Sequence, residues 1–71
     1  MKKKILITGS NGFLGNLAKE YFNLNYELVF VDLSSSSEAN FYKADIGNFS
    51  EIDDIITKEK PNIIFHFASE I

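Results

Sequence analysis

The sequence predicts an α/β fold in which parallel strands alternate with amphipathic helices. Short apolar runs rich in β-branched residues recur along the chain, as is typical of strands covered on both faces. Two segments between these runs have a helical period instead. Glycines at positions 9, 12 and 15 lie where the first strand would meet the first helix. At 71 residues, the chain is expected to form one small domain, spanning residues 1–71.

The first strand and helix are predicted from a change of period near Gly12. Lys4–Thr8 is a nearly continuous apolar run that ends at a glycine, which indicates a buried strand. The sequence Asn23-Leu24-Asn25 is expected to end the helix, because asparagine tolerates the left-handed conformation. A stripe at i, i+3, i+4, i+7 and i+8 is expected to face the core: Leu14, Leu17, Ala18, Tyr21 and Phe22.

Two further strands are expected in the middle of the chain. Leu28–Val31 is a second buried run, and Asp32 ends it. Leu33–Asn40 is expected to be a loop, because its four serines hydrogen-bond their own backbone. A third strand is placed at Phe41–Lys43, although parallel strands are usually joined by longer connections.

A second helix and a last strand complete the predicted order. Asn48 and Glu51 have capping-box spacing, with asparagine in place of the usual serine or threonine. The helix is expected to end before Pro61, and Ile63–Phe67 is the last strand. The apolar stripe of this helix consists of Phe49, Ile52, Ile55 and Ile56.

The order β-α-β-β-α-β and right-handed crossovers together predict the spatial strand order 3-2-1-4. The two helices would then cover opposite faces of the sheet. This arrangement is most of the first half of a Rossmann fold, whose ligands bind beyond the carboxyl ends of the strands. The expected binding place is the switch point between the first and fourth strands.

The glycine spacing indicates a phosphate site. Main-chain N–H groups in the first turn of a helix attract anions, provided that no side chain blocks them. Gly9 would allow a sharp turn, Gly12 would leave room for a pyrophosphate, and Gly15 would let the helix pack closely on the sheet. Asp32 follows 17 residues after Gly15, which is the context that a dinucleotide site requires. An ordinary glycine-rich turn without a ligand is the alternative.

Composition excludes several other classes. A net charge of −3, with a single cationic run at Lys2–Lys4, argues against a nucleic-acid partner. The absence of cysteine excludes disulfides and cysteine metal sites, and no metal ligand set is expected. No apolar run has the length of a membrane span, so no membrane partner is expected. The run Ile5–Ile7 is too short for an export signal, so a cytoplasmic location is expected.

The spacing G-x-x-G-x-x-G differs from the common dinucleotide fingerprint and matches another pattern. The segment T-G-S-N-G-F-L-G at Thr8–Gly15 resembles the T-G-x-x-G-F-x-G signature of extended short-chain dehydrogenases/reductases, the NAD-dependent sugar epimerase/dehydratase group. Three later features are similar to that family in the expected order: Asp32, Ala44-Asp45-Ile46, and His66-Phe67-Ala68-Ser69 in place of H-x-A-A.

This resemblance implies an NAD site. Asp32 would accept hydrogen bonds from the adenosine ribose and repel the 2′-phosphate of NADP, so NAD is expected over NADP. Asp45 would bind the adenine amino group, and the Ile46 backbone would lie along the base. Ordinary structural roles are the alternatives: a hydrated acid for Asp32, a turn for Asp45 and a core histidine for His66. The other expected cofactor-binding residues are Gly9, Ser10, Asn11, Gly12, Phe13, Leu14, Gly15, His66, Phe67 and Ala68.

Catalysis is not expected from this chain alone. The family uses a Tyr-x-x-x-Lys pair, whereas Tyr21, Tyr26 and Tyr42 are followed four residues later by Asn25, Phe30 and Ile46. The resemblance therefore implies an amino-terminal segment of a larger enzyme, which lacks the later strands and the substrate domain. A nucleotide-sugar substrate would belong to that larger enzyme.

Two other functions remain open. One is a non-catalytic nucleotide-binding or remnant module, and the other is a nucleotide-dependent methyltransferase, which also places an acid after the second strand. The last strand, Ile63–Phe67, would have an apolar free edge, so self-association is expected.

Overall fold

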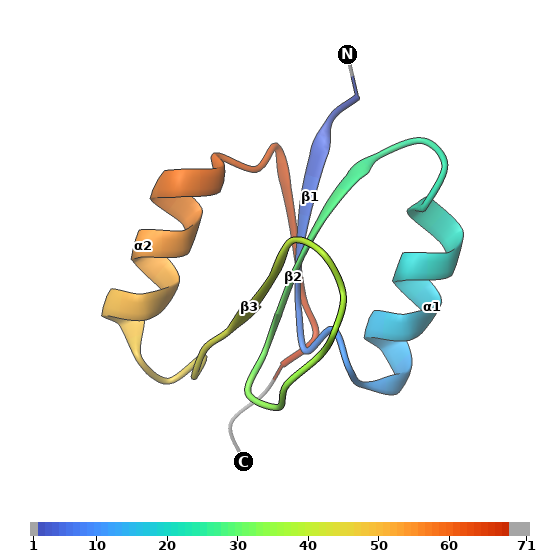
Figure 1. Cartoon of the computed structure of the whole chain (residues 1–71). Coiled ribbons are helices and arrows are strands. Elements are labelled where there is room, and N and C mark those ends of the chain that lie inside the picture. Colours follow the sequence, from blue (N-terminus) through green and yellow to red (C-terminus); the bar gives the residue numbers. More distant parts are fainter. Residues whose placement is uncertain (1, 69–71) are drawn as a thin grey trace.

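A computed structural model of the chain describes residues 2–68 and has a three-layer α/β architecture (Figure 1). The four strands form one parallel sheet in the order β3-β2-β1-β4, which confirms the predicted order. The two helices cover opposite faces of this sheet. The elements are β1 (Lys4–Thr8), α1 (Phe13–Phe22), β2 (Glu27–Asp32), β3 (Phe41–Lys43), α2 (Phe49–Glu59) and β4 (Ile63–His66).

The strand register brings three carboxyl ends together. Thr8, the last residue of β1, pairs with Val31 of β2 on one side and His66 of β4 on the other. The turn after β1 therefore begins between the segments that follow β2 and β4. This is the switch point of the sheet, where α/β proteins bind ligands.

The core has two apolar layers, because successive side chains of a strand point to opposite faces. Leu6 of β1 packs with Val29 and Val31 on the α2 face. Ile5 and Ile7 pack with Ala18 and Leu28 on the α1 face. All three β1 side chains are essentially inaccessible to solvent. The central strand is thus held firmly from both sides.

The prediction of which α1 residues face the core is wrong in part. Only Gly15 and Ala18 are buried in this helix, and Phe22 is partly buried. Leu14, Leu17 and Tyr21 are 54%, 47% and 79% exposed. The sheet below has no strand beyond β4 in the described residues, so only the narrower stripe of α1 has a surface to pack on. α1 ends at Phe22, directly before the predicted stop at Asn23-Leu24-Asn25. Asn23 has right-handed dihedral angles and Asn25 has no positive φ, so the left-handed conformation expected there is wrong.

The ends of α2 agree with the predicted capping. Asn48 Oδ1 accepts a hydrogen bond from the Glu51 N–H at 3.3 Å, as the capping spacing predicts. Lys60 closes the helix in the left-handed region, at φ 50°, just before Pro61. Ile55 is buried and Ile52 and Ile56 are half-buried, but Phe49 is 85% exposed.

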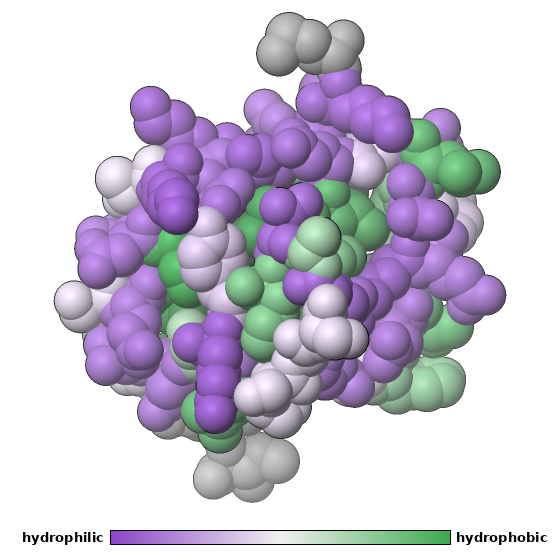
Figure 2. Space-filling model, viewed as in Figure 1, coloured by the Kyte–Doolittle hydropathy of each residue, from purple (hydrophilic) through white to green (hydrophobic). Residues whose placement is uncertain are grey.

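The described residues have a mostly hydrophilic exterior on the face seen in Figure 2, with hydrophobic patches near the centre and beside α1. Neither helix in residues 2–68 has the length and apolar character needed to cross a membrane. Within the same range, no three histidine, cysteine or acidic residues come together as a metal site would require.

Candidate functional site

The turn after β1 requires glycine at its first position. Gly9 has φ +68°, a conformation that other residues rarely adopt. A Cβ atom at Gly9 would lie 2.7 Å from the Ala68 backbone nitrogen and 2.9 Å from the Phe67 carbonyl carbon. The chain after β1 thus passes directly against the chain after β4, which requires a residue without a side chain.

The other two glycines have different neighbours. A Cβ at Gly15 would lie 2.4 Å from Gly9 O and 2.7 Å from Ser10 Cα, so α1 contacts the turn itself and not only the sheet. A Cβ at Gly12 would meet only Gly9 O, at 3.3 Å, and is otherwise in open space. Gly15 is therefore needed for close packing, whereas the outer side of Gly12 is free for a ligand.

The start of α1 offers donors to an anion. Gly12 occupies the N-cap position without a side-chain cap, and the first turn contains no acidic residue. The first N–H groups of a helix have no partner within the helix and carry partial positive charge. Ser10 Oγ is completely buried and has no hydrogen-bond partner among the described residues. The uncapped N–H groups at the start of α1 fit a phosphate group bound at this turn.

Asp32 forms hydrogen bonds that link the end of β2 to the turn at residues 9–12, which is called the glycine turn below. Its Oδ2 accepts from the Asn11 N–H at 2.9 Å, and its Oδ1 accepts from the Ser34 N–H and hydroxyl, both at 3.1 Å. Partial burial by itself would raise the pKa of Asp32. The hydrogen bonds, led by that of Asn11, outweigh burial and lower the pKa below its ordinary value. The carboxylate is therefore held in its charged form.

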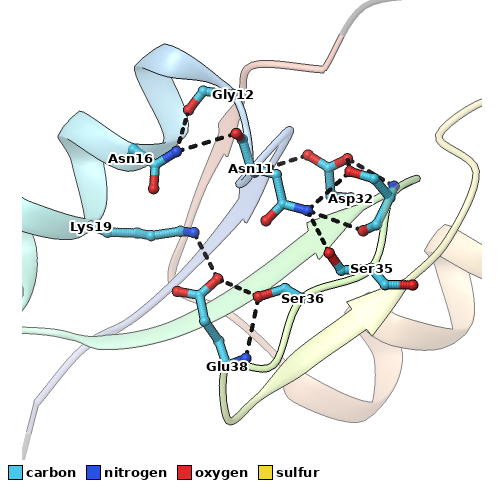
Figure 3. A network of polar contacts seen from close by, with 9 residues as sticks. Asn11, Gly12, Asn16, Lys19, Asp32, Ser35, Ser36 and Glu38 are labelled. Carbon is cyan, nitrogen blue, oxygen red and sulfur yellow. Dashed lines mark hydrogen bonds and ion pairs between the residues drawn. The ribbon is translucent and has the colours of Figure 1, made fainter.

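The loop that follows β2, residues 33–40, contains four serines and is called the serine loop below; side-chain contacts join it to the glycine turn and to α1 (Figure 3). Asn11 Nδ2 donates to the carbonyls of Ser34 and Ser35 and to the Ser34 hydroxyl, at 3.0 to 3.3 Å. Farther along, Lys19 of α1 forms a 2.7 Å ion pair with Glu38, whose Oε1 also accepts from the Ser36 hydroxyl at 2.9 Å. The loop after β2 is thus ordered by side chains from two other elements.

A cavity of about 420 Å³ opens beside Asp32 at the carboxyl ends of the strands. Asp45 lies in its wall, where its Oδ1 accepts from the Gly47 N–H at 2.9 Å in a turn of its own. Carboxylates and apolar side chains therefore line one hollow, which suits a heterocyclic base with an attached sugar. The lining residues are Thr8, Gly9, Val31, Asp32, Leu33, Ala44, Asp45, Ile46 and Ala68.

His66 lies outside this cavity. Its Nδ1 is 2.8 Å from the buried Thr8 hydroxyl, which also accepts from the Ala68 N–H at 3.4 Å. The imidazole lines a separate apolar hollow of about 260 Å³ between β4 and α2. Phe67 turns to the other face and stacks on Phe65, with ring centroids 5.8 Å apart. The histidine thus positions the chain after β4 through Thr8.

The structure gathers most of the predicted site residues into one place. Gly9, Asp32, Asp45, Ile46 and Ala68 line the cavity, and the start of α1 lies next to it through the Asn11–Asp32 contact. The Phe13 and Leu14 side chains, in the first turn of α1, are 79% and 54% exposed. Ser69, the last residue of the predicted H-x-A-A-like segment, lies outside the described residues.

Several side-chain contacts that organise the site were not predicted from the sequence. The Asn11 side chain, Ser34 and the Lys19–Glu38 pair organise the loop after Asp32. Serine two residues after an aspartate is a turn pattern, so the Ser34–Asp32 contact had a local signal. The contacts of Asn11 and Lys19 join segments about twenty residues apart and had none.

Comparison with known proteins agrees with this geometry. Residues 5–71 match the NAD dependent epimerase/dehydratase family. The chain belongs to that family. CDP-paratose 2-epimerase of Salmonella typhi is 34% identical, over 96% of this chain and 24% of that protein. dTDP-glucose 4,6-dehydratase of Salmonella typhimurium is 32% identical, over 94% of this chain and 23% of that protein.

Among solved structures, L-threonine dehydrogenase from Phytophthora infestans superposes with a TM-score of 0.83 at 25% identity. The match covers 97% of this chain and 24% of that enzyme. The chain therefore corresponds to about a quarter of the length of these epimerase/dehydratase-family and related proteins. Its Rossmann-type sheet, with strand order 3-2-1-4, is the part that they have in common.

Proposed function

We propose that this chain binds NAD, with the pyrophosphate at the start of α1 and the adenosine in the cavity beside Asp32. The observation that carries the proposal is the contact between the Asn11 N–H and Asp32 Oδ2, which joins the phosphate turn to the acid beside the cavity. Membership of an NAD dependent family supports the same cofactor. In this arrangement Asp45 and Ile46 would contact the adenine.

Charge favours NAD over NADP. Asp32 presents a negative charge where the adenosine ribose would lie, and a 2′-phosphate would be repelled by it. Lys19 is the cation of α1 nearest the serine loop, and it is already paired with Glu38 at 2.7 Å. Because this cation is engaged, it offers a 2′-phosphate little compensation.

We assign to this chain cofactor binding without catalysis of its own. Its sequence has no Tyr-x-x-x-Lys pair, and its match covers about a quarter of its relatives. In a longer protein, the same segment would serve an epimerase or dehydratase acting on a nucleotide sugar, as the names of the two Salmonella relatives indicate. The absence of cysteine fits a reducing, cytoplasmic compartment.

Calorimetric titration of the purified chain tests this function. NAD is expected to bind measurably, NADP more weakly, and S-adenosylmethionine not at all. Circular dichroism and a cooperative melt must first establish that the sample is folded. A folded sample that binds none of the three contradicts the proposal and favours a remnant module, whereas selective binding of S-adenosylmethionine favours a methyltransferase-type site.

We also propose that a second copy of this chain covers the outer edge of β4. In the described residues β4 pairs only with β1, so its other edge presents free N–H and C=O groups. Ile64 is 46% exposed on one face of β4, and Phe67 is 36% exposed just after it. No lysine, proline or acidic residue interrupts Ile63–His66, although such residues usually protect an edge strand.

A two-fold axis normal to the sheet would make this pairing self-complementary. Antiparallel pairing centred on Phe65 would place Phe65 opposite its counterpart and Ile64 opposite His66 of the other copy, with side chains on matching faces. The exposed stripe of α1 lies away from the flank that contacts the serine loop and would help to cover the seam. This stripe consists of Leu14, Leu17 and Tyr21. Together with Ile64 and Phe67 it has a solvent-exposed area on the order of 500 Å², and the backbone of the strand edge adds to this area. A standard protein interface buries roughly 800 Å² per partner.

A further inference from the structure

The hydrogen-bond capacity of Asp32 is nearly filled by its own chain. A carboxylate has about four acceptor positions. In this structure, three are taken by the Asn11 N–H, the Ser34 N–H and the Ser34 hydroxyl. The 2′- and 3′-hydroxyls of a ribose bring two donors, and only one position is left for them. One of the three existing donors must therefore leave before both hydroxyls can bind.

The three donors are not equally easy to release. The Asn11 N–H belongs to the tight turn that begins with Gly9, and the Ser34 N–H is fixed by the chain leaving β2. The Ser34 hydroxyl is the exception, because rotation about one side-chain bond moves it away from Asp32 without any change of backbone. Ser34 is exposed, so a rotated hydroxyl can hydrogen-bond to water.

We infer that the Ser34 hydroxyl occupies, in the free chain, the place that a ribose hydroxyl takes on Asp32, and that it competes with the ribose for this position. Asn11 Nδ2 keeps the serine there, since it donates to Ser34 Oγ at 3.0 Å. Ser34 thus sets how strongly the site prefers a ribose with two free hydroxyls. This inference rests on the proposed function, because it concerns the same adenosine site.

The test is the Ser34→Ala variant, titrated with ADP and with 2′-deoxy-ADP. Loss of one neutral competitor is expected to tighten ADP binding roughly fivefold. 2′-Deoxy-ADP has one ribose hydroxyl and needs only the position that is already free, so its affinity is expected to stay unchanged. Ser35→Ala is the matched control, because Ser35 accepts from Asn11 only through its carbonyl. Ser34→Thr retains a hydroxyl and is expected to bind like the parent chain.

Each result decides between a competing and a supporting role for Ser34. Unchanged or weaker ADP binding by Ser34→Ala, or equal tightening for both nucleotides, would overturn the inference. If the parent chain binds ADP in these experiments and NAD in the calorimetric titration above, the proposed function stands whichever way Ser34 behaves. A cooperative melt establishes that the variant is folded, and an NMR titration checks that the pKa of Asp32 rises in it, because one donor to the charged carboxylate is gone.

Discussion

The Asn11 N–H donates a hydrogen bond to Asp32 Oδ2 at 2.9 Å, across 21 residues of sequence. This contact fixes the distance between the N-terminus of α1, which suits a phosphate, and the acid that suits a ribose. The N-terminus of α1 and Asp32 both lie at the carboxyl end of the parallel sheet. The fold thus holds the two halves of the proposed adenosine diphosphate site at a fixed distance from each other.

Replacement of Asp32 by asparagine is predicted to weaken NAD binding at least about tenfold, because hydrogen bonds to a charged group are among the stronger ones. Discrimination against NADP is expected to fall as well, since the repelling charge is removed. Calorimetry with both nucleotides measures these effects. Asp54→Asn, which removes an exposed carboxylate from α2, is the control and is expected to bind NAD like the parent chain. NAD binding by Asp32→Asn at full strength would contradict the role of the acid.

The glycines separate packing from binding. Gly15→Ala is predicted to destabilise the chain by about 2 kcal/mol, despite the better helix propensity of alanine, because backbone atoms lie 2.4 and 2.7 Å from the new Cβ. Gly12→Ala is predicted to change stability by less than about 1 kcal/mol, since its φ of −81° suits any residue. The Gly12 variant is nevertheless expected to lose NAD affinity, because its methyl group fills the open side of the turn.

Urea denaturation followed by NAD titration checks both glycine variants. Equal stability of Gly15→Ala and the parent chain would contradict the close contact between α1 and the turn. Full NAD affinity in a folded Gly12→Ala variant would place the phosphate elsewhere.

Helix α1 and the serine loop show which features of the fold and of the site could be predicted from the sequence and which could not. The strands and the capping of α2 were predictable, because period, capping residues and glycine positions are local signals. The exposure of Leu17 and Tyr21 was not, since it depends on the width of the sheet beneath α1. Likewise the sequence predicted that Asn11 and Asp32 belong to the site, but not that the Asn11 side chain and Asp32 both contact Ser34, because those contacts depend on how distant segments meet.

Acid is predicted to destabilise the chain through Glu59. This carboxylate accepts from the Tyr42 hydroxyl and, at 3.1 Å, from Lys4 Nζ; these partners, the tyrosine first, lower its pKa. A carboxylate whose pKa is lower in the folded state than in the unfolded state stabilises the fold when it is charged. This stabilisation is fully present above the pKa of the unfolded state, which is about 4.3. It is lost as the pH falls through the pKa of the folded state. Glu59→Gln is expected to lower the Tm by a few degrees at pH 7 and to have a smaller loss of Tm between pH 5 and pH 3.

The control for the acid experiment is again Asp54→Asn, which is expected to keep the parent pH profile. Thermal melts at several pH values give the comparison. An identical acid dependence of Tm in Glu59→Gln and the parent chain would show that the link between α2, β1 and β3 does not contribute.

Self-association is predicted to depend on the β4 edge. Ile64→Lys places a charge on the strand that would pair with a second copy, and lysine on an edge strand opposes such pairing. Sedimentation velocity over a range of concentrations is expected to show dimers for the parent chain and monomers for the variant. Leu24→Lys, at an exposed position after α1, is the control and should dimerise. A parent chain that stays monomeric at high concentration would contradict the pairing.

The most direct test of the central claim is an NMR titration of the ¹⁵N-labelled chain with NAD. Binding at the start of α1 and beside Asp32 predicts saturable amide shifts concentrated in residues 9–15, at Asp32 and Ser34, and at Asp45 and Ile46, with little change in α2. A well-dispersed spectrum that does not respond to NAD, or shifts confined to other segments, would contradict a dinucleotide site at this turn.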